Sequence, residues 1–292
     1  MARTRPIEEG LIPAVPVPFR GDLIDETALR SYAAWMATMP VSGVAIWAHT
    51  GRGPHLSPEQ RQLVLEVWRE ALPGKTIVAG ARDITMAIEA RRGGADALLA
   101  FPELENTVEY HRRLGRELPV LAFYLYQAAG GVAYSDDTLH AILSLPEVTG
   151  IKVATLDSVM TFQRITGIVR SHPGKLLVTG EDRFLGYSLM MGATVALIGM
   201  GSALTDIQGR LIASHAAGDW PGFHRLSSDC DAFAEATFTE PMDGYIRRML
   251  WSLAEEGIIP WESTDDPWGP TLSPADRSRV QAAVRHARQA RG

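Results

Sequence analysis

The sequence predicts a single (β/α)₈ barrel with additional helices at its C-terminal end, and three observations support this prediction. Short apolar runs alternate with longer amphipathic runs, and the alternation repeats eight times along the chain. The apolar runs are continuous, which is typical of parallel strands that are covered on both faces. The chain has 292 residues, a normal length for one barrel of this kind.

Each of the eight predicted units consists of a strand followed by a helix. The strands are expected at residues 11–19, 43–48, 76–79, 97–101, 120–126, 149–153, 176–179 and 194–198. The helices are expected at residues 26–39, 58–71, 84–92, 108–116, 136–145, 158–171, 183–191 and 203–217. Ser57 followed by Pro58 is a typical helix start, and the Pro-Gly pairs at 73–74 and 173–174 end helices. We therefore expect a barrel domain over residues 1–218.

A helical pattern continues over residues 219–292, beyond the eighth unit. Prolines interrupt this pattern at Pro260, Pro267 and Pro270. No linker composition separates these residues from the barrel. We therefore expect a helical extension that packs on the barrel.

The composition excludes several classes of function. Hydrophobic residues make up 46% of the chain and charged residues 21%, with a net charge of −6, which is ordinary for a soluble globular protein. Nucleic-acid binding is not expected, because there is no basic excess or basic stripe. No apolar run approaches the roughly 18 residues of a membrane span, and none follows the polar N-terminus, so we expect a cytoplasmic protein without a membrane segment or signal peptide. The single cysteine, Cys230, cannot form an internal disulfide.

Lys152 stands out because only three of the 28 lysines and arginines are lysines. Lys75 and Lys175 each follow a Pro-Gly pair, in turns that lead into strands. Lys152 instead ends the apolar sixth strand, where burial disfavours the ammonium form and lowers the pKa. A neutral amine in that place can attack a carbonyl carbon and form an imine. A structural lysine paired with a buried carboxylate is the alternative.

Short motifs, in order along most of the chain, resemble the dihydrodipicolinate synthase and N-acetylneuraminate lyase family. The Gly-Ile-Lys triplet that ends at Lys152 is similar to the family's Schiff-base segment. The other matching motifs lie at residues 16–19, 48–52, 56–59, 118–131, 180–182 and 192–193. The resemblance implies a class I aldolase or a related dehydratase on a (β/α)₈ barrel. Such a protein is usually a tetramer and binds pyruvate or a related 2-oxo acid as an imine.

The resemblance also implies roles for individual residues. Lys152 matches the imine-forming lysine. Tyr124 matches the tyrosine that relays protons, with Tyr126 as a rival, and strand alternation would place both on one face. Thr50, with the amides of Thr50 and Gly51, matches the cradle for the substrate carboxylate. Further substrate contacts are implied at Tyr126, Gly180 and Ile198.

The motifs also depart from the family pattern. His49 replaces the first threonine of the family's loop and Arg52 replaces its glutamate, so His49 is expected to take part in the proton relay. No tyrosine lies at residues 102–104, where a neighbouring subunit usually lends one. Ala129 stands where the synthases that condense aspartate semialdehyde carry an arginine. We therefore expect a reaction other than dihydrodipicolinate synthesis, with an aldehyde or a sugar acid as the second substrate.

Several alternatives stay open. The histidines lie mostly on predicted helices without metal-ligand spacing, so neither a metal nor a cofactor is expected. The glycines at residues 199–202 also fit a phosphate site before a helix. The barrel could bind a 2-oxo acid without turning it over, or act as a sugar-acid dehydratase. A homodimer or homotetramer is expected from the resemblance.

Overall fold

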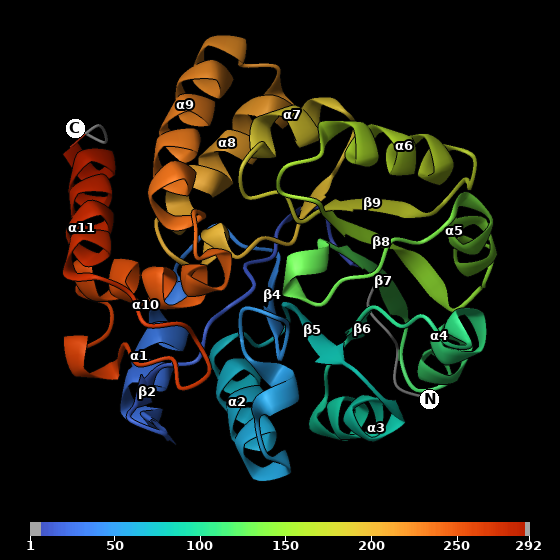
Figure 1. Ribbon diagram of the computed structural model, residues 1–292, viewed down its shortest axis with the longest axis horizontal. Coiled ribbons are helices and arrows are strands. Elements are labelled where there is room, and N and C mark those ends of the chain that lie inside the picture. The colour runs from blue at the N-terminus through green and yellow to red at the C-terminus, as the bar shows by residue number, and fades with distance from the viewer. Residues whose placement is uncertain (1–6, 290–292) are drawn as a thin grey trace.

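A computed structural model describes residues 7–289, in which eight parallel strands form a ring surrounded by helices (Figure 1). The strands are β1 (Gly10–Leu11), β4 (Gly43–Ile46), β5 (Thr76–Ala81), β6 (Ala97–Ala100), β7 (Val120–Leu125), β8 (Val148–Ala154), β9 (Leu176–Thr179) and β10 (Val195–Ala196). Their order is β1-β10-β9-β8-β7-β6-β5-β4, and neighbouring strands are parallel. A parallel bridge between Ala14 and Ala45 brings the two edges together. The predicted barrel is confirmed.

A helix follows each strand of the ring and covers its outer face (Figure 1). These helices are α1 (Glu26–Met36), α2 (Pro58–Ala71), α3 (Ile84–Gly93), α4 (Thr107–Gly115), α5 (Asp136–Leu143), α6 (Val159–Arg170), α7 (Leu185–Met190) and α8 (Thr205–Ala217). Ser57 caps α2 in a capping box with Gln60, as the Ser-Pro signal indicates. Across residues 7–289, none of the helices has the length and apolar character needed to cross a lipid bilayer.

The first predicted strand, residues 11–19, is the main departure from the expected elements. The chain pairs with the neighbouring strands through β1, the bridge at Ala14 and backbone hydrogen bonds as far as Val15, and it then enters a small antiparallel hairpin of β2 (Phe19–Arg20) and β3 (Leu23–Ile24). Pro13, Pro16 and Pro18 lack the amide hydrogens that a continuous strand would donate. The apolar run at residues 11–19 therefore extends beyond the last residue that pairs with a neighbouring strand of the barrel.

Alternate strand residues divide the apolar side chains into two clusters. The cluster inside the barrel contains Ile12, Ala14, Ala45, Ala48, Val78, Ala97, Leu99, Leu121, Phe123, Leu125, Ala154, Val178, Val195 and Leu197. The larger cluster lies between the strands and the helices and includes Tyr124 and Ile198. In the register of β7 and β8, Phe123 pairs with Lys152 and Tyr124 pairs with Val153. Neighbours in a strand point to opposite faces, so Lys152 and Phe123 share the inner face and Tyr124 does not.

The C-terminal extension consists of α9 (Trp220–Thr237), α10 (Tyr245–Glu255) and α11 (Pro274–Gln289), which lie beside α8 and α1 in Figure 1. Its buried residues, among them Phe238 and Met249, belong to the same cluster as the outer face of the barrel. The sequence pattern predicted helix from residue 219 to Pro260 without a break. The structure instead turns at residues 238–244, between α9 and α10. The domain boundary at residue 218 stays a prediction.

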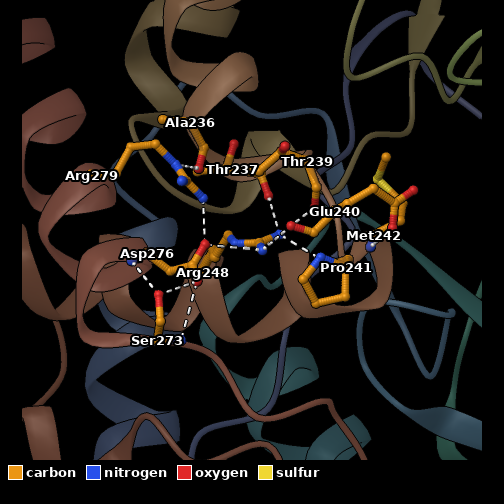
Figure 2. A network of polar contacts seen from close by, with 10 residues as sticks. All are labelled: Ala236, Thr237, Thr239, Glu240, Pro241, Met242, Arg248, Ser273, Asp276 and Arg279. Carbon is orange, nitrogen blue, oxygen red and sulfur yellow. Dashed lines mark hydrogen bonds and ion pairs between the residues drawn. The ribbon is translucent and has the colours of Figure 1, made fainter.

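Arg248 holds this turn in place (Figure 2). Its guanidinium is fully buried and donates to the carbonyl oxygens of Thr237 (3.3 Å), Thr239 (2.6 Å), Glu240 (3.2 Å) and Pro241 (3.2 Å). It also pairs with the Asp276 carboxylate at 3.4 Å. A planar fork of donors suits a turn that directs several carbonyl groups inward. The turn therefore has a defined path beside the open ends of the strands.

Candidate active site

Lys152 lies near the end of β8 and points into the barrel. It is only 6% exposed, and its Nζ lies 4.3 Å from the centroid of the Phe123 ring. A β-carbon on Gly180 would lie 2.5 Å from Cε of Lys152, so glycine leaves room for the lysine stem. Burial lowers the pKa of Lys152, although the charges of Asp182 and Glu181 oppose this shift. The predicted inward, buried lysine is present.

Two buried carboxyl groups follow β9 and flank the lysine. Asp182 accepts from the Met200 amide at 2.7 Å, and Glu181 accepts from the amides of Thr155 (2.6 Å) and Leu156 (2.8 Å). Burial raises the pKa of both groups, in the case of Glu181 to about 7. Neither residue was predicted to have a role in the site. An acidic pair directly after an apolar strand is the signal that would have identified them.

Lys152 lines a small cavity at the C-terminal ends of the strands, where barrels of this kind carry their chemistry. Most of its lining residues come from strand ends and the loops after them, but two come from the C-terminal extension. The lining residues are His49, Thr50, Phe123, Leu125, Tyr126, Lys152, Ala154, Leu156, Gly180, Asp182, Gly199, Phe238 and Tyr245. Phe238 and Tyr245 flank the turn that Arg248 holds.

The loop after β4 presents His49 and Thr50 to this cavity. It is tightly wound around Trp47, whose φ of 55° lies in the left-handed region. The buried indole of Trp47 donates to the Arg61 carbonyl at 3.0 Å, which helps to stabilise this conformation. A β-carbon on Gly53 would lie 1.9 Å from the Trp47 carbonyl oxygen, so only glycine fits there. The local sequence therefore fixes the direction of the two side chains.

Tyr245, the first residue of α10, was not predicted as a site residue. Its hydroxyl lies 3.0 Å from Nδ1 of His49 and 2.8 Å from Oγ1 of Thr50. Its ring stacks on Phe238 with centroids 4.6 Å apart. On the other side of the imidazole, Nε2 of His49 lies 3.3 Å from Asp243. A phenol, an imidazole and a carboxylate therefore stand in a row.

Arg52 ties the same loop to the extension. It makes a bidentate pair with Asp266, at 2.9 and 2.7 Å, and contacts Asp243 at 3.1 Å. Both carboxylates belong to the C-terminal extension, so these pairs join the loop after β4 to the segments around α10. The hydrogen bond with His49, together with the charge of Arg52, lowers the pKa of Asp243 to about 2. Asp243 is therefore ionised at neutral pH.

The structure corrects two predicted site residues. Tyr124 points into the outer cluster, packs 6.2 Å from the ring of Tyr134, and lines a wider neighbouring pocket, not the Lys152 cavity. Ile198 is likewise buried in the outer cluster, and the next residue, Gly199, lines the cavity in its place. In both cases the strand pleat turns the side chain away from the lysine.

Tyr126 takes the place that was expected of Tyr124. The strand ends at Leu125, and both tyrosines line the wider pocket, but Tyr126 also lines the Lys152 cavity and Tyr124 does not. Its ring lines the Lys152 cavity, and its buried hydroxyl has no hydrogen-bond partner among residues 7–289. Burial raises its pKa above the ordinary value. The hydroxyl is thus neutral, buried and without a hydrogen-bond partner in the described part of the chain.

The remaining predicted residues lie in or beside the cavity. His49, Thr50 and Gly180 line it, and Gly51 packs beneath the loop. A β-carbon on Gly51 would lie 3.0 Å from the carbonyl oxygen of Val15. Within residues 7–289, neither the Thr50 amide nor the Gly51 amide donates to another group. Two free amides in one turn are suited to an anion.

Two larger pockets open on either side of this cavity. One has polar walls and is lined by His49, Arg52, Pro54, His55, Arg82, Phe101, Pro102, Glu103, Leu125, Ala128, Ala129, Gly130, Asp243 and Trp268. The other is bounded by aromatic, hydroxyl and charged side chains that include Tyr126, Ser158, Arg183, Phe238 and Glu240. His49 borders both the Lys152 cavity and the polar pocket.

Comparisons with known proteins show the family and the fold of the chain. Residues 8–287 match the model of the dihydrodipicolinate synthetase family. A 4-hydroxy-tetrahydrodipicolinate synthase from Anaplasma marginale (strain Florida) is 27% identical over 80% of this chain and 81% of its own. Two solved structures cover 96–97% of the chain. One is a monomeric dihydrodipicolinate synthase variant, with a TM-score of 0.86, 16% identity and 97% of its chain covered. The other is Ruminococcus gnavus sialic acid aldolase, with a TM-score of 0.83, 20% identity and 98% of its chain covered. The chain belongs to the dihydrodipicolinate synthetase family.

Proposed function

We propose that this protein is a class I lyase that binds pyruvate or a related 2-oxo acid as a Schiff base on Lys152. The observation that carries this proposal is a buried lysine of lowered pKa at the C-terminal end of a barrel strand. The neutral amine attacks the carbonyl carbon, and loss of water from the carbinolamine gives an imine. The protonated imine then serves as an electron sink for bond making or breaking at the neighbouring carbon.

The surroundings of Lys152 support roles for three further groups. The free amides of Thr50 and Gly51 suit the substrate carboxylate. The unpartnered hydroxyl of Tyr126 suits the carbinolamine oxygen, to which it donates as water leaves. Asp182, a buried carboxyl group beside Lys152, suits the exchange of a proton with the amine.

The second substrate is proposed to be an aldehyde or a hydroxylated sugar acid other than aspartate semialdehyde. Ala129 lines the polar pocket and offers no guanidinium for a second carboxylate. The other pocket mixes aromatic and hydroxyl side chains, which favours a hydroxylated chain. The curated relatives are named as synthases, so aspartate semialdehyde belongs in any substrate panel. Turnover of a sugar acid without carbon–carbon cleavage would instead indicate a dehydratase.

Borohydride trapping with pyruvate tests the proposal. We expect reduction to fix one pyruvate-derived group on Lys152, seen by intact mass and peptide mapping. Lys152→Ala should abolish the adduct while the protein remains folded. Lys75→Ala, which removes a lysine from a turn before β5, is the matched control and should label like the wild type. Absence of any adduct with pyruvate and larger 2-oxo acids would favour a barrel that binds its ligand without imine chemistry.

A further inference from the structure

We propose that Tyr245, His49 and Asp243 form a proton relay that carries a proton between C3 of the lysine-bound 2-oxo acid and the polar pocket. This inference rests on the proposed Schiff base at Lys152. It assigns the acid–base step at the carbon atom to a tyrosine from the C-terminal extension. That tyrosine lies 93 residues beyond Lys152 in the sequence (245 minus 152).

One hydrogen bond and one ion-pair contact join the three groups in a row. The Tyr245 hydroxyl lies 3.0 Å from Nδ1 of His49, and Nε2 of the same ring lies 3.3 Å from Asp243. The imidazole and phenol rings are nearly parallel, at 24°. Both nitrogens of one histidine are thus engaged, one by a phenol and one by a carboxylate.

The carboxylate fixes which nitrogen carries the proton. Ionised Asp243 only accepts hydrogen bonds, so the neutral imidazole places its hydrogen on Nε2. Nδ1 is then the acceptor, and the Tyr245 hydroxyl donates to it. The Thr50 hydroxyl, 2.8 Å away, must in turn donate to the Tyr245 oxygen. The same logic orders a carboxylate, a histidine and a hydroxyl in serine hydrolases.

His49 stands in the wall between two cavities of different character. Tyr245 is buried on the Lys152 side, with 5% of its surface exposed. The side chains of His49 and Asp243 are 18% and 41% exposed, and both border the polar pocket. Exposure therefore increases along the row. A proton released from Nε2 of His49 can pass to solvent in the polar pocket without opening the cavity around the imine.

The chemical step balances with these groups alone. The Tyr245 oxygen takes a proton from C3 of the iminium as its own proton moves to Nδ1 of His49. The C3–H electrons form the C2–C3 double bond, and the C=N electron pair returns to the Lys152 nitrogen as the enamine forms. His49 becomes an imidazolium that Asp243 stabilises, and the Nε2 proton leaves to water in the polar pocket.

The alternative phenols are less suited to this step. Phe123 faces Lys152 but has no hydroxyl group. The Tyr126 hydroxyl has no partner among the described residues, so no base is in place to receive its proton. A phenol of raised pKa accepts a proton efficiently only if its own proton can leave at the same time. Tyr245 meets this condition through His49.

Exchange of the pyruvate methyl protons in D₂O, followed by NMR, isolates the step. Tyr245→Phe should slow the exchange by roughly 10²- to 10⁴-fold, the usual effect of a positioned acid–base group. Borohydride trapping on Lys152 should persist in this variant, because imine formation does not use the relay. Tyr32→Phe is the matched control. It removes a buried hydroxyl that donates to the Ser202 carbonyl at 2.9 Å, and its exchange should equal that of the wild type.

Two further variants separate a proton relay from a structural role. Asp243→Asn should slow exchange, and Asp243→Glu should restore part of it, with trapping unchanged in both. If Tyr245→Phe does not fold, His49→Gln decides, since glutamine keeps polarity but cannot accept and release a proton. Exchange at the wild-type rate in a folded Tyr245→Phe or His49→Gln variant would overturn the relay. Loss of trapping in the wild type would instead overturn the Schiff base.

Discussion

At the scale of single residues, the hydroxyl of Tyr126 is a buried polar group without a hydrogen-bond partner among residues 7–289. An unsatisfied buried hydroxyl costs about 1–3 kcal/mol of stability. Such a cost is common for polar groups in binding sites, because the substrate supplies their hydrogen-bond partner only in the complex. The Tyr126 hydroxyl therefore lowers the stability of the ligand-free protein, and the proposed carbinolamine would supply the missing hydrogen-bond partner.

Tyr126→Phe should make the free protein more stable and less active. We expect the free energy of unfolding to rise by about 1 kcal/mol, because the unpartnered hydroxyl is removed. Turnover should fall by roughly 10²-fold or more, if the hydroxyl acts as proton donor. Tyr32→Phe is the matched control and should change turnover little, since its hydroxyl donates to the Ser202 carbonyl and does not line the Lys152 cavity. Urea denaturation and steady-state kinetics on both variants measure the two effects; an equal loss of activity from Tyr32→Phe would contradict the assignment.

Some site residues could be predicted from the sequence and others could not, depending on the residues next to them in the chain. Lys152 could be predicted, because an apolar strand makes a lysine conspicuous. Choosing between Tyr124 and Tyr126 requires knowing the residue at which β7 ends. A continuous run of apolar residues does not indicate that position. Tyr245 could not be predicted. It begins an amphipathic helix, where an aromatic residue has the pattern of ordinary core packing.

At the scale of elements, the eight strand–helix units could be predicted closely, but the turn between α9 and α10 could not. The helix bounds differ from expectation by no more than three residues. The turn at residues 238–244 contains one proline, Pro241, which weakly indicates a break. Its path depends on Arg248, whose contacts exist only in the folded chain. Tertiary hydrogen bonds, not local propensity, place this part of the site.

Arg248→Met should destabilise the protein strongly. Methionine fills much of the volume but leaves the carbonyl groups of the turn without a donor in a buried place. We expect a loss of about 3 kcal/mol or more in the free energy of unfolding. Arg285→Met is the matched control, because the Arg285 side chain is 56% exposed and its partner among residues 7–289 is Glu255. That change should cost less than about 1 kcal/mol. Equal losses in urea denaturation would show that Arg248 does not hold the turn.

At the scale of the whole molecule, the barrel could be predicted from alternation and length, but the position of the C-terminal extension could not. The extension lies beside the open ends of the strands and supplies Phe238, Asp243, Tyr245 and Asp266 to the site and its supports. Ion pairs over long sequence distances join it to the barrel, such as that of Arg52 with Asp266. The sequence does not show which arginine pairs with which carboxylate, because the chain contains many residues of both kinds.

The carboxyl groups of Asp276 and Glu181 make the stability of the folded protein depend on pH in opposite directions. Asp276 has a pKa of about 2, because hydrogen bonds from Ser273 and Arg279 and the charge of Arg248 outweigh the effect of burial. Its stabilising contribution is complete above its ordinary pKa of 3.8 and is lost as the pH falls through about 2. Glu181 has a raised pKa of about 7 against an ordinary 4.5. The folded state therefore holds a proton that the unfolded state has lost, and stability falls as the pH rises from 4.5 to about 7.

These two groups together predict the greatest stability near pH 4 to 5, below neutral pH, as judged by urea denaturation from pH 2 to pH 8. Asp276→Asn should reduce the acid-side slope, to which Asp243 also contributes, and leave the slope from pH 4.5 to 7 unchanged. Glu181→Gln should reduce that slope, to which Asp182 also contributes, and leave the acid side unchanged, whatever its effect on absolute stability. A wild-type profile that rises steadily from pH 4 to pH 7 would contradict the predicted protonation of Glu181 in the folded state.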